Sequence, residues 1–105
     1  TCSLGTAALS WKQLYLDFTK TTVGTTGNQT INKACGRVNI AAAGTTVTVT
    51  NSLVTAASQI FCTIMTNDAT GTLKNVVPAA GSFVITLTAA ATAELAVCFL
   101  VVNTD

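Results

Sequence analysis

The chain has 105 residues, of which half are hydrophobic, and a formal net charge of +1 at pH 7. Only 9% of its residues are charged, against about 25% in ordinary soluble domains, and it contains no His. This composition argues against a disordered chain and against nucleic acid as a partner, because nothing could neutralise a row of phosphates. The longest apolar run, at 95–102, is too short for a membrane span, so we expect no membrane insertion. The sparse charge predicts an oligomer or a part of a larger assembly.

The first residues are expected to form a lead-in segment (1–12) that precedes a single domain (13–105). Residues 13–19 read QLYLDFT. Leu14, Leu16 and Phe18 alternate there with Tyr15 and Asp17, which predicts a half-buried strand. A polar loop with two glycines follows at 21–29, and a short strand is expected at 30–32.

Two further strands are expected at 36–41 and 46–51. In the first, Val38 and Ile40 are predicted to face inward, whereas Arg37 and Asn39 face outward. In the second, valines alternate with threonines in the sequence TVTVTN, which predicts one buried face and one face lined by threonine.

The strand expected at 59–66 has apolar residues on both faces, with Phe61 and Met65 opposite Ile60, Cys62 and Ile64. A turn follows at 67–71, and the next strand, at 73–77, is expected to end at Pro78. A second turn at 79–81 leads into a strand at 82–88. There, the inward residues are expected to be Phe83, Ile85 and Leu87.

The last strand, at 94–102, is the most apolar part of the sequence. One face carries Leu95, Val97, Phe99 and Val101, and the other carries Ala96, Cys98, Leu100 and Val102. A strand with two apolar faces belongs in the middle of a sheet or at a subunit interface. The candidate interface residues are therefore Phe61, Met65, Cys98, Leu100 and Val102.

Seven to eight short strands separated by turns predict an all-β fold, a small antiparallel β-sandwich of the jelly-roll-like kind. Two strands with two apolar faces are more than the core of so small a sandwich needs. We therefore expect a closed symmetric homo-oligomer, which would bury the remaining apolar faces between subunits.

The four cysteines, Cys2, Cys35, Cys62 and Cys98, have none of the close spacings of zinc or redox motifs. We expect unpaired thiols in or near the core. One or two disulfides remain an alternative, and four cysteines allow three connectivities. No metal or other cofactor is expected, and without His or neighbouring carboxylates we do not expect an enzyme.

Leu4-Gly5, Trp11 and Leu14-Tyr15 give the pattern L-G-x5-W-x2-L-Y. This resembles a segment near the end of many bacteriophage tail-fibre and tailspike proteins. The remainder is similar to a small C-terminal β-module of such fibres, through five stretches: GRVNI at 36–40, VTNSLV at 49–54 with Ser58, TNDAT at 66–70, PAAGSF at 78–83 and VCFLVVN at 97–103. The resemblance implies a homotrimeric distal module of a phage tail. Its partners would be other virion proteins and a host cell-surface glycan.

The residues expected to contact a receptor are Arg37, Asn39, Asn67, Asp68 and Thr70. Arg37, the sole arginine, could hold an anionic receptor group, although we favour an ion pair with Asp17 or Asp68. Asn67, Asp68 and Thr70 form a polar turn. The lone carboxylate of Asp68 would make a weak cation site there, so no metal is expected.

Trp11 and Tyr15 are the only Trp and Tyr of the chain, and both lie close to the lead-in segment. We expect them to anchor the incoming chain against the body of the domain. Stacking on a sugar is the alternative for both.

Two other function classes remain open. A capsid-associated decoration protein would dock on a shell and would not bind host cells. A secreted bacterial carbohydrate-binding or surface-filament module would be extracellular and would pair its cysteines. A hydrolase is rejected unless Asp17, Asp68 and Glu94 share a cleft.

Overall fold

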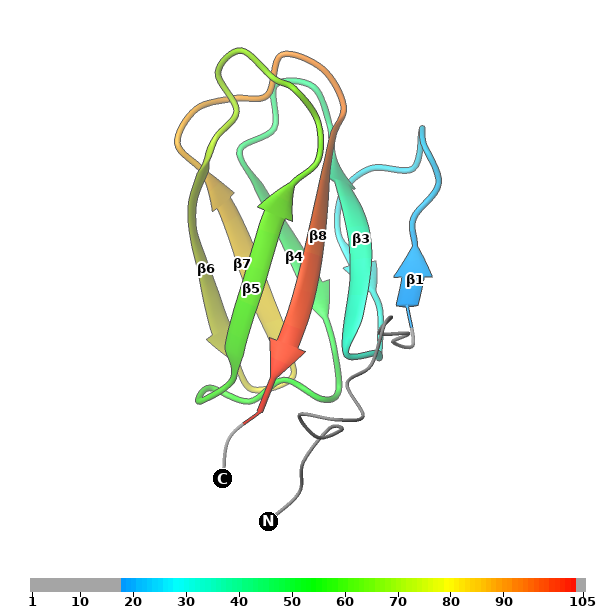
Figure 1. The fold of residues 1–105 in the computed structure, drawn as a ribbon, viewed down its shortest axis with the longest axis vertical. Coiled ribbons are helices and arrows are strands. Elements are labelled where there is room, and N and C mark those ends of the chain that lie inside the picture. Colours follow the sequence, from blue (N-terminus) through cyan, green and yellow to red (C-terminus); the bar gives the residue numbers. More distant parts are fainter. Residues whose placement is uncertain (1–17, 104–105) are drawn as a thin grey trace, which may run out of the picture.

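The computed structural model describes residues 18–103, which form eight strands and no helix. The strands are β1 (Phe18–Lys20), β2 (Gln29–Thr30), β3 (Cys35–Ile40), β4 (Thr46–Thr50), β5 (Gln59–Ile64), β6 (Leu73–Ala79), β7 (Ser82–Leu87) and β8 (Leu95–Val102). Sheet 1 has the order β1-β3-β8-β5, and sheet 2 has the order β2-β4-β7-β6. Figure 1 shows sheet 1 in front of sheet 2. Within these residues, no helix is long and apolar enough to cross a membrane.

The predicted all-β sandwich is confirmed. From β3 onward the chain crosses from one sheet to the other at every connection except the β6–β7 hairpin, as in a jelly roll. The six strands β3 to β8 pair antiparallel, whereas the short strands β1 and β2 pair parallel with β3 and β4. The parallel pairs arise because the chain visits the opposite sheet between β1 and β3, and between β2 and β4.

The core lies between the two sheets and follows the predicted alternation. The inward-facing residues of β3, β4, β7 and β8 are almost completely buried, and those of β5 pack against them. Phe83 of sheet 2 meets Phe99 of sheet 1 edge to face, with the ring centroids 5.0 Å apart. A Cβ at Gly36 would lie 3.0 Å from the Phe99 ring and 2.8 Å from the Thr19 carbonyl oxygen, so only glycine fits opposite this ring.

Two expectations about single elements are wrong. Pro78 does not end its strand, because β6 continues to Ala79. β6 is an edge strand, where a missing N–H costs no ladder bond. Phe18 does not face the core either: it pairs in register with Cys35 on the outer face of sheet 1 and is 44% exposed. The lead-in segment (1–12) and residues 13–17 lie outside the described residues.

The connection between β4 and β5 runs along the bottom end of the sandwich in Figure 1, and a buried asparagine holds it. Asn51 is fully buried, its amide donates to the Lys33 carbonyl oxygen, and its side-chain oxygen accepts from the Leu53 N–H. Next to it, Asn103 accepts from the Ser58 hydroxyl and donates to the Leu53 carbonyl oxygen. These bonds fix the path of the chain between β4 and β5.

Candidate functional site

The structure brings the five predicted interface residues together on the outer face of sheet 1. The register of β5 with β8 places Phe61 opposite Leu100 and Thr63 opposite Cys98. Val102 lies two residues beyond Leu100, and the Met65 N–H bonds to the Ala96 carbonyl oxygen. On the other side of β8, Leu100 is opposite Cys35, which pairs with Phe18. A row of apolar residues therefore crosses the whole sheet.

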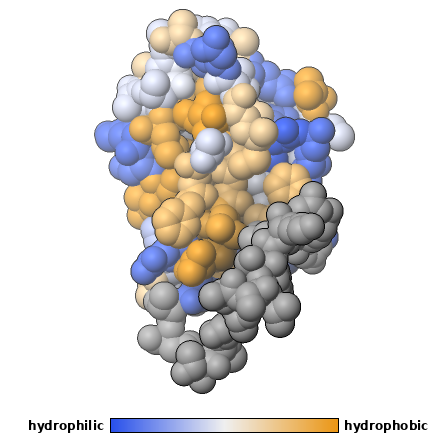
Figure 2. All heavy atoms as spheres, viewed as in Figure 1, coloured by the Kyte–Doolittle hydropathy of each residue, from blue (hydrophilic) through white to orange (hydrophobic). Residues whose placement is uncertain are grey.

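Much of this outer face is exposed. Phe61 is 59% exposed and Met65 is 54% exposed, and Val102 also lies at the surface. Figure 2 shows hydrophobic residues running along the face between hydrophilic margins. From typical side-chain areas, the exposed parts of Phe18, Phe61, Met65 and Val102 sum to on the order of 350 Å². The largest apolar patch of a typical monomer covers about 300–600 Å² and is often functional, so this face is a candidate contact surface.

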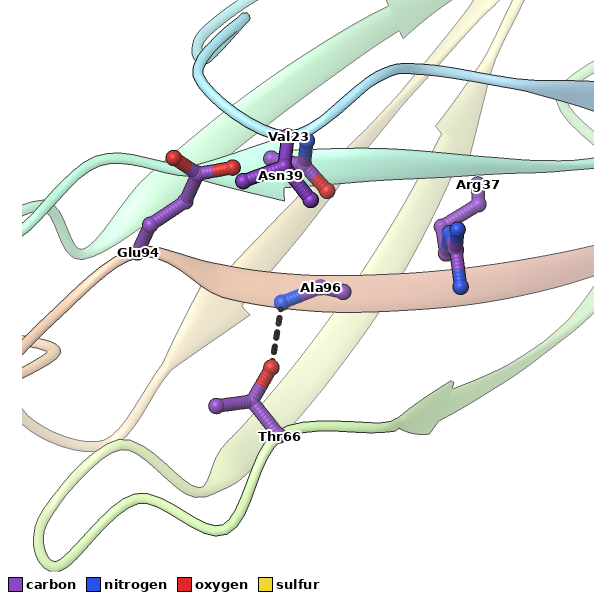
Figure 3. Close-up of a pocket in the computed structure, with 6 residues that line it drawn as sticks. All are labelled: Val23, Arg37, Asn39, Thr66, Glu94 and Ala96. Carbon is purple, nitrogen blue, oxygen red and sulfur yellow. Dashed lines mark hydrogen bonds between the residues drawn. The ribbon is translucent and has the colours of Figure 1, made fainter.

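A hollow of about 150 Å³ lies at the top end of the same face, where β5 ends and β8 begins. It is lined by Val23, Arg37, Asn39, Thr66, Glu94 and Ala96. In Figure 3, Arg37 and Glu94 stand at opposite ends of the hollow, and Asn39 and Ala96 lie between them. Val23 overhangs the hollow from the loop before β2, and the Thr66 hydroxyl oxygen accepts the Ala96 N–H at 2.9 Å.

Arg37 has few partners in this hollow. Its Nη1 donates to the Met65 sulfur at 3.8 Å, and its Nε is buried without a hydrogen-bond partner. The ion pair with Asp68 that we favoured is absent, because the Asp68 oxygens bond elsewhere. Asp17, the other predicted partner, lies outside the described residues. With respect to the described residues, the guanidinium therefore has spare donors beside an apolar surface.

Receptor contact through Asn39 stays a prediction, but this residue offers little surface. Asn39 is on the outer face, as predicted, but it is only 2% exposed because the loop after β1 folds over it. Its amide donates to the Thr22 and Thr25 carbonyl oxygens at 2.9 and 3.2 Å. Both oxygens of Glu94 accept the Gly24 N–H, at 3.0 and 2.9 Å. These four bonds hold the loop that carries Val23 against sheet 1.

The predicted turn at 67–71 lies at the surface and is also bonded to the loop before β8. Asp68 accepts the backbone N–H groups of Gly71 and Thr70 through one oxygen, and the N–H and hydroxyl of Thr92 through the other. These bonds hold the pKa of the Asp68 carboxyl well below its usual range, with the Gly71 N–H as the largest cause. The Thr70 hydroxyl donates to the Ala90 carbonyl oxygen. Asn67 is exposed, so receptor contact through this turn stays a prediction.

Cys62 and Cys98 are unpaired thiols on opposite faces of sheet 1. Cys62 points into the sandwich, where burial raises its pKa to about 12. Cys98 is half-buried on the outer face, its Sγ contacts the Met65 sulfur, and desolvation raises its pKa. Neither thiol is activated, which fits a packing role.

Sequence reasoning did not single out Glu94, Thr66 and Val23 as members of one hollow. No local pattern marks them, since they come from three segments far apart in the chain. Trp11 and Tyr15, the predicted anchors, lie outside the described residues. Among residues 18–103, no three His, Cys, Asp or Glu side chains cluster in a way that could hold a metal ion. Comparison with family models, with curated proteins and with solved structures finds no match.

Proposed function

We propose that this chain is a self-associating structural module, a homotrimeric distal domain of a bacteriophage tail fibre or spike that also attaches to the host surface. The observation that carries the assembly part is the exposed apolar face of sheet 1, in which Phe61, Met65 and Phe18 stand at the surface. Three copies that turn this face toward a common axis would bury it in a closed, finite assembly.

The size of the face supports a further copy of this chain as its occupant. Roughly 350 Å² of exposed apolar side chain approaches what one partner contributes to the core of a specific interface, which buries about 800 Å² per partner in all. The low charge of the chain points the same way, because charged residues are depleted in interface cores.

The tail location rests on the resemblance of the sequence motifs. The unpaired thiols Cys62 and Cys98 agree with assembly in a reducing cytoplasm, where phage particles mature, and agree less well with a secreted module. The structural bonds of Asn51, Ser58 and Asn103 give physical reasons for three of the residues that carry the resemblance.

Light scattering on a size-exclusion column tests the assembly. The wild-type chain should have three times the mass of one 10.7 kDa chain, with and without reductant. Phe61→Lys should give the mass of one chain, because a charge at the apolar face cannot be buried unpaired. Val77→Lys is the matched control: Val77 is 54% exposed but lies on sheet 2, so this variant should keep the wild-type mass. A monomeric wild type at micromolar concentration overturns the proposal.

Attachment is tested by incubating the labelled protein with intact bacterial cells and, separately, with phage capsids. Retention by cells of a susceptible host supports the fibre module. Retention by capsids alone would replace it with a decoration protein. A monomeric protein with paired cysteines that binds neither would favour the secreted module.

A further inference from the structure

We propose that the hollow between Arg37 and Glu94 binds a small hydroxy-carboxylate, namely the carboxylate and neighbouring hydroxyl groups of an acidic sugar. This names the ligand class for the attachment role proposed above and rests on that proposal for its biological meaning. The hollow borders the proposed interface, because the Met65 sulfur accepts from Arg37 Nη1. The apolar row through Phe61 and Leu100 crosses sheet 1 closer to the bottom end, whereas the hollow lies at the top end.

The cationic end of the hollow, formed by Arg37, is suited to a ligand group with two acceptor oxygens. Arg37 carries five N–H donors in a planar fork, and among the described residues no carboxylate pairs with it. Its hydrogen-bond partner among the described residues, the Met65 sulfur at 3.8 Å, is a weak acceptor. A carboxylate matches the fork in a bidentate way, whereas a neutral hydroxyl uses one donor at most.

The opposite end calls for a hydrogen-bond donor. Glu94 accepts one N–H, that of Gly24, through both of its oxygens, and a carboxylate has about four acceptor sites. Its charge disfavours a second anionic group nearby, so a ligand with a negative charge at both ends is excluded. The Thr66 hydroxyl, which accepts the Ala96 N–H, still has its own proton to donate. A ligand with one carboxylate and several hydroxyl groups fits these positions.

The size and walls of the hollow fit a single sugar ring. Its volume of about 150 Å³ is below that of pockets for drug-sized molecules, which span roughly 300–1,000 Å³. Ala96 lies between the charged ends, and the overhanging Val23, 86% exposed, offers an apolar surface to the C–H face of a ring. Covering Val23 with a ligand would remove apolar surface from water.

The test is a nuclear magnetic resonance titration of the ¹⁵N-labelled full chain with glucuronate. The amides of Gly24 and Ala96 and the Arg37 Nε–H should shift and saturate at millimolar ligand. Glucose, which lacks the carboxylate, and acetate, which lacks the hydroxyls, should each bind at least about tenfold more weakly. A short oligomer of glucuronate separates the sources: binding of the oligomer as well as of free glucuronate indicates a sugar within a chain, and binding of free glucuronate alone indicates a free ligand.

Three variants complete the test. Arg37→Gln should weaken glucuronate binding about tenfold or more, and Arg37→Lys, which keeps the charge but loses the fork, should lie between it and the wild type. Lys74→Gln removes a positive charge from sheet 2 and should bind like the wild type. Equal binding by wild type and Arg37→Gln, equal losses in both Gln variants, or absence of saturation would each overturn the proposal. Light scattering on the same samples shows separately whether the assembly proposal fails.

Discussion

Phe61 and Phe99 lie on neighbouring strands of sheet 1 but on opposite faces, so the same substitution distinguishes burial within one chain from burial between chains. Phe99 is 2% exposed and meets Phe83 across the sandwich, whereas Phe61 is 59% exposed. Phe99→Ala should lower the free energy of unfolding by about 3–5 kcal/mol, the usual cost of a large cavity. This is a large part of the about 5–15 kcal/mol that stabilises a typical domain.

Phe61→Ala should have a different effect in a single chain and in an assembly. In an isolated chain the residue contributes little, and the change should stay within about 0.5 kcal/mol. Its exposed fraction of 59% corresponds to on the order of 120 Å² of a phenylalanine side chain. If a neighbouring copy covers this area, the loss is about 3 kcal/mol per chain at about 25 cal/mol per Å².

Urea unfolding followed by circular dichroism measures both effects, at two protein concentrations about a hundredfold apart. Phe99→Ala should lower the midpoint at both concentrations, since its cavity lies within one chain. Phe61→Ala should lower it mainly at the higher concentration, because mass action adds the interface to the stability. A large loss for Phe61→Ala in dilute solution would refute the exposed position of this residue. No loss at either concentration would refute burial of Phe61 between copies.

Three further outcomes follow from the same structure. Gly36→Ala should lower the thermal midpoint, with a cost of about 1–3 kcal/mol, because the new Cβ meets the Phe99 ring and a backbone oxygen; an unchanged midpoint would contradict the close approach. The depressed pKa of Asp68 means that its ionised form stabilises the fold above its unfolded value of 3.8, and that this stability is lost as pH falls below about 4. Asp68→Asn should therefore show a flatter acid limb in denaturation midpoints, and a steeper one would argue against the bond set. Because burial raises the pKa of Cys62 to about 12, a thiol reagent at pH 8 should label it only when the domain unfolds, as peptide mass analysis would show.

The two faces of β5 and β8 could be predicted from the sequence because strand alternation has a period of two. Leu95 and Val97 are assigned to one face and Leu100 to the other on this basis alone, and in the structure the first two are buried between the sheets and Leu100 lies on the outer face. The pairing of β5 with β8 was not predictable, because it joins segments about 40 residues apart and no local signal selects the partner. That pairing is what brings Phe61 next to Leu100.

The candidate site was harder to predict because loops complete it. Arg37 was recognised from its residue type, but Asn39 was expected to be exposed, since alternation places it on the outer face. The loop that covers Asn39 is held by Glu94, which lies 70 residues from Gly24, so the contact has no local signature. The prediction that Pro78 ends its strand failed for a related reason. Whether a proline interrupts a strand depends on whether that strand lies at the edge of its sheet, which the local sequence does not show.

The central place of β8 in sheet 1 has a consequence for how the chain folds. β8 lies between β3 and β5 in sheet 1 and is the last strand of the described residues. During synthesis, β3 and β5 therefore lack their shared neighbour until this segment has left the ribosome. Among the described strands, β6 and β7 form the one hairpin of sequence neighbours, and this pair can form first. Until β8 pairs with them, the edges of β3 and β5 are open to strands of other chains, which favours misassociation during synthesis.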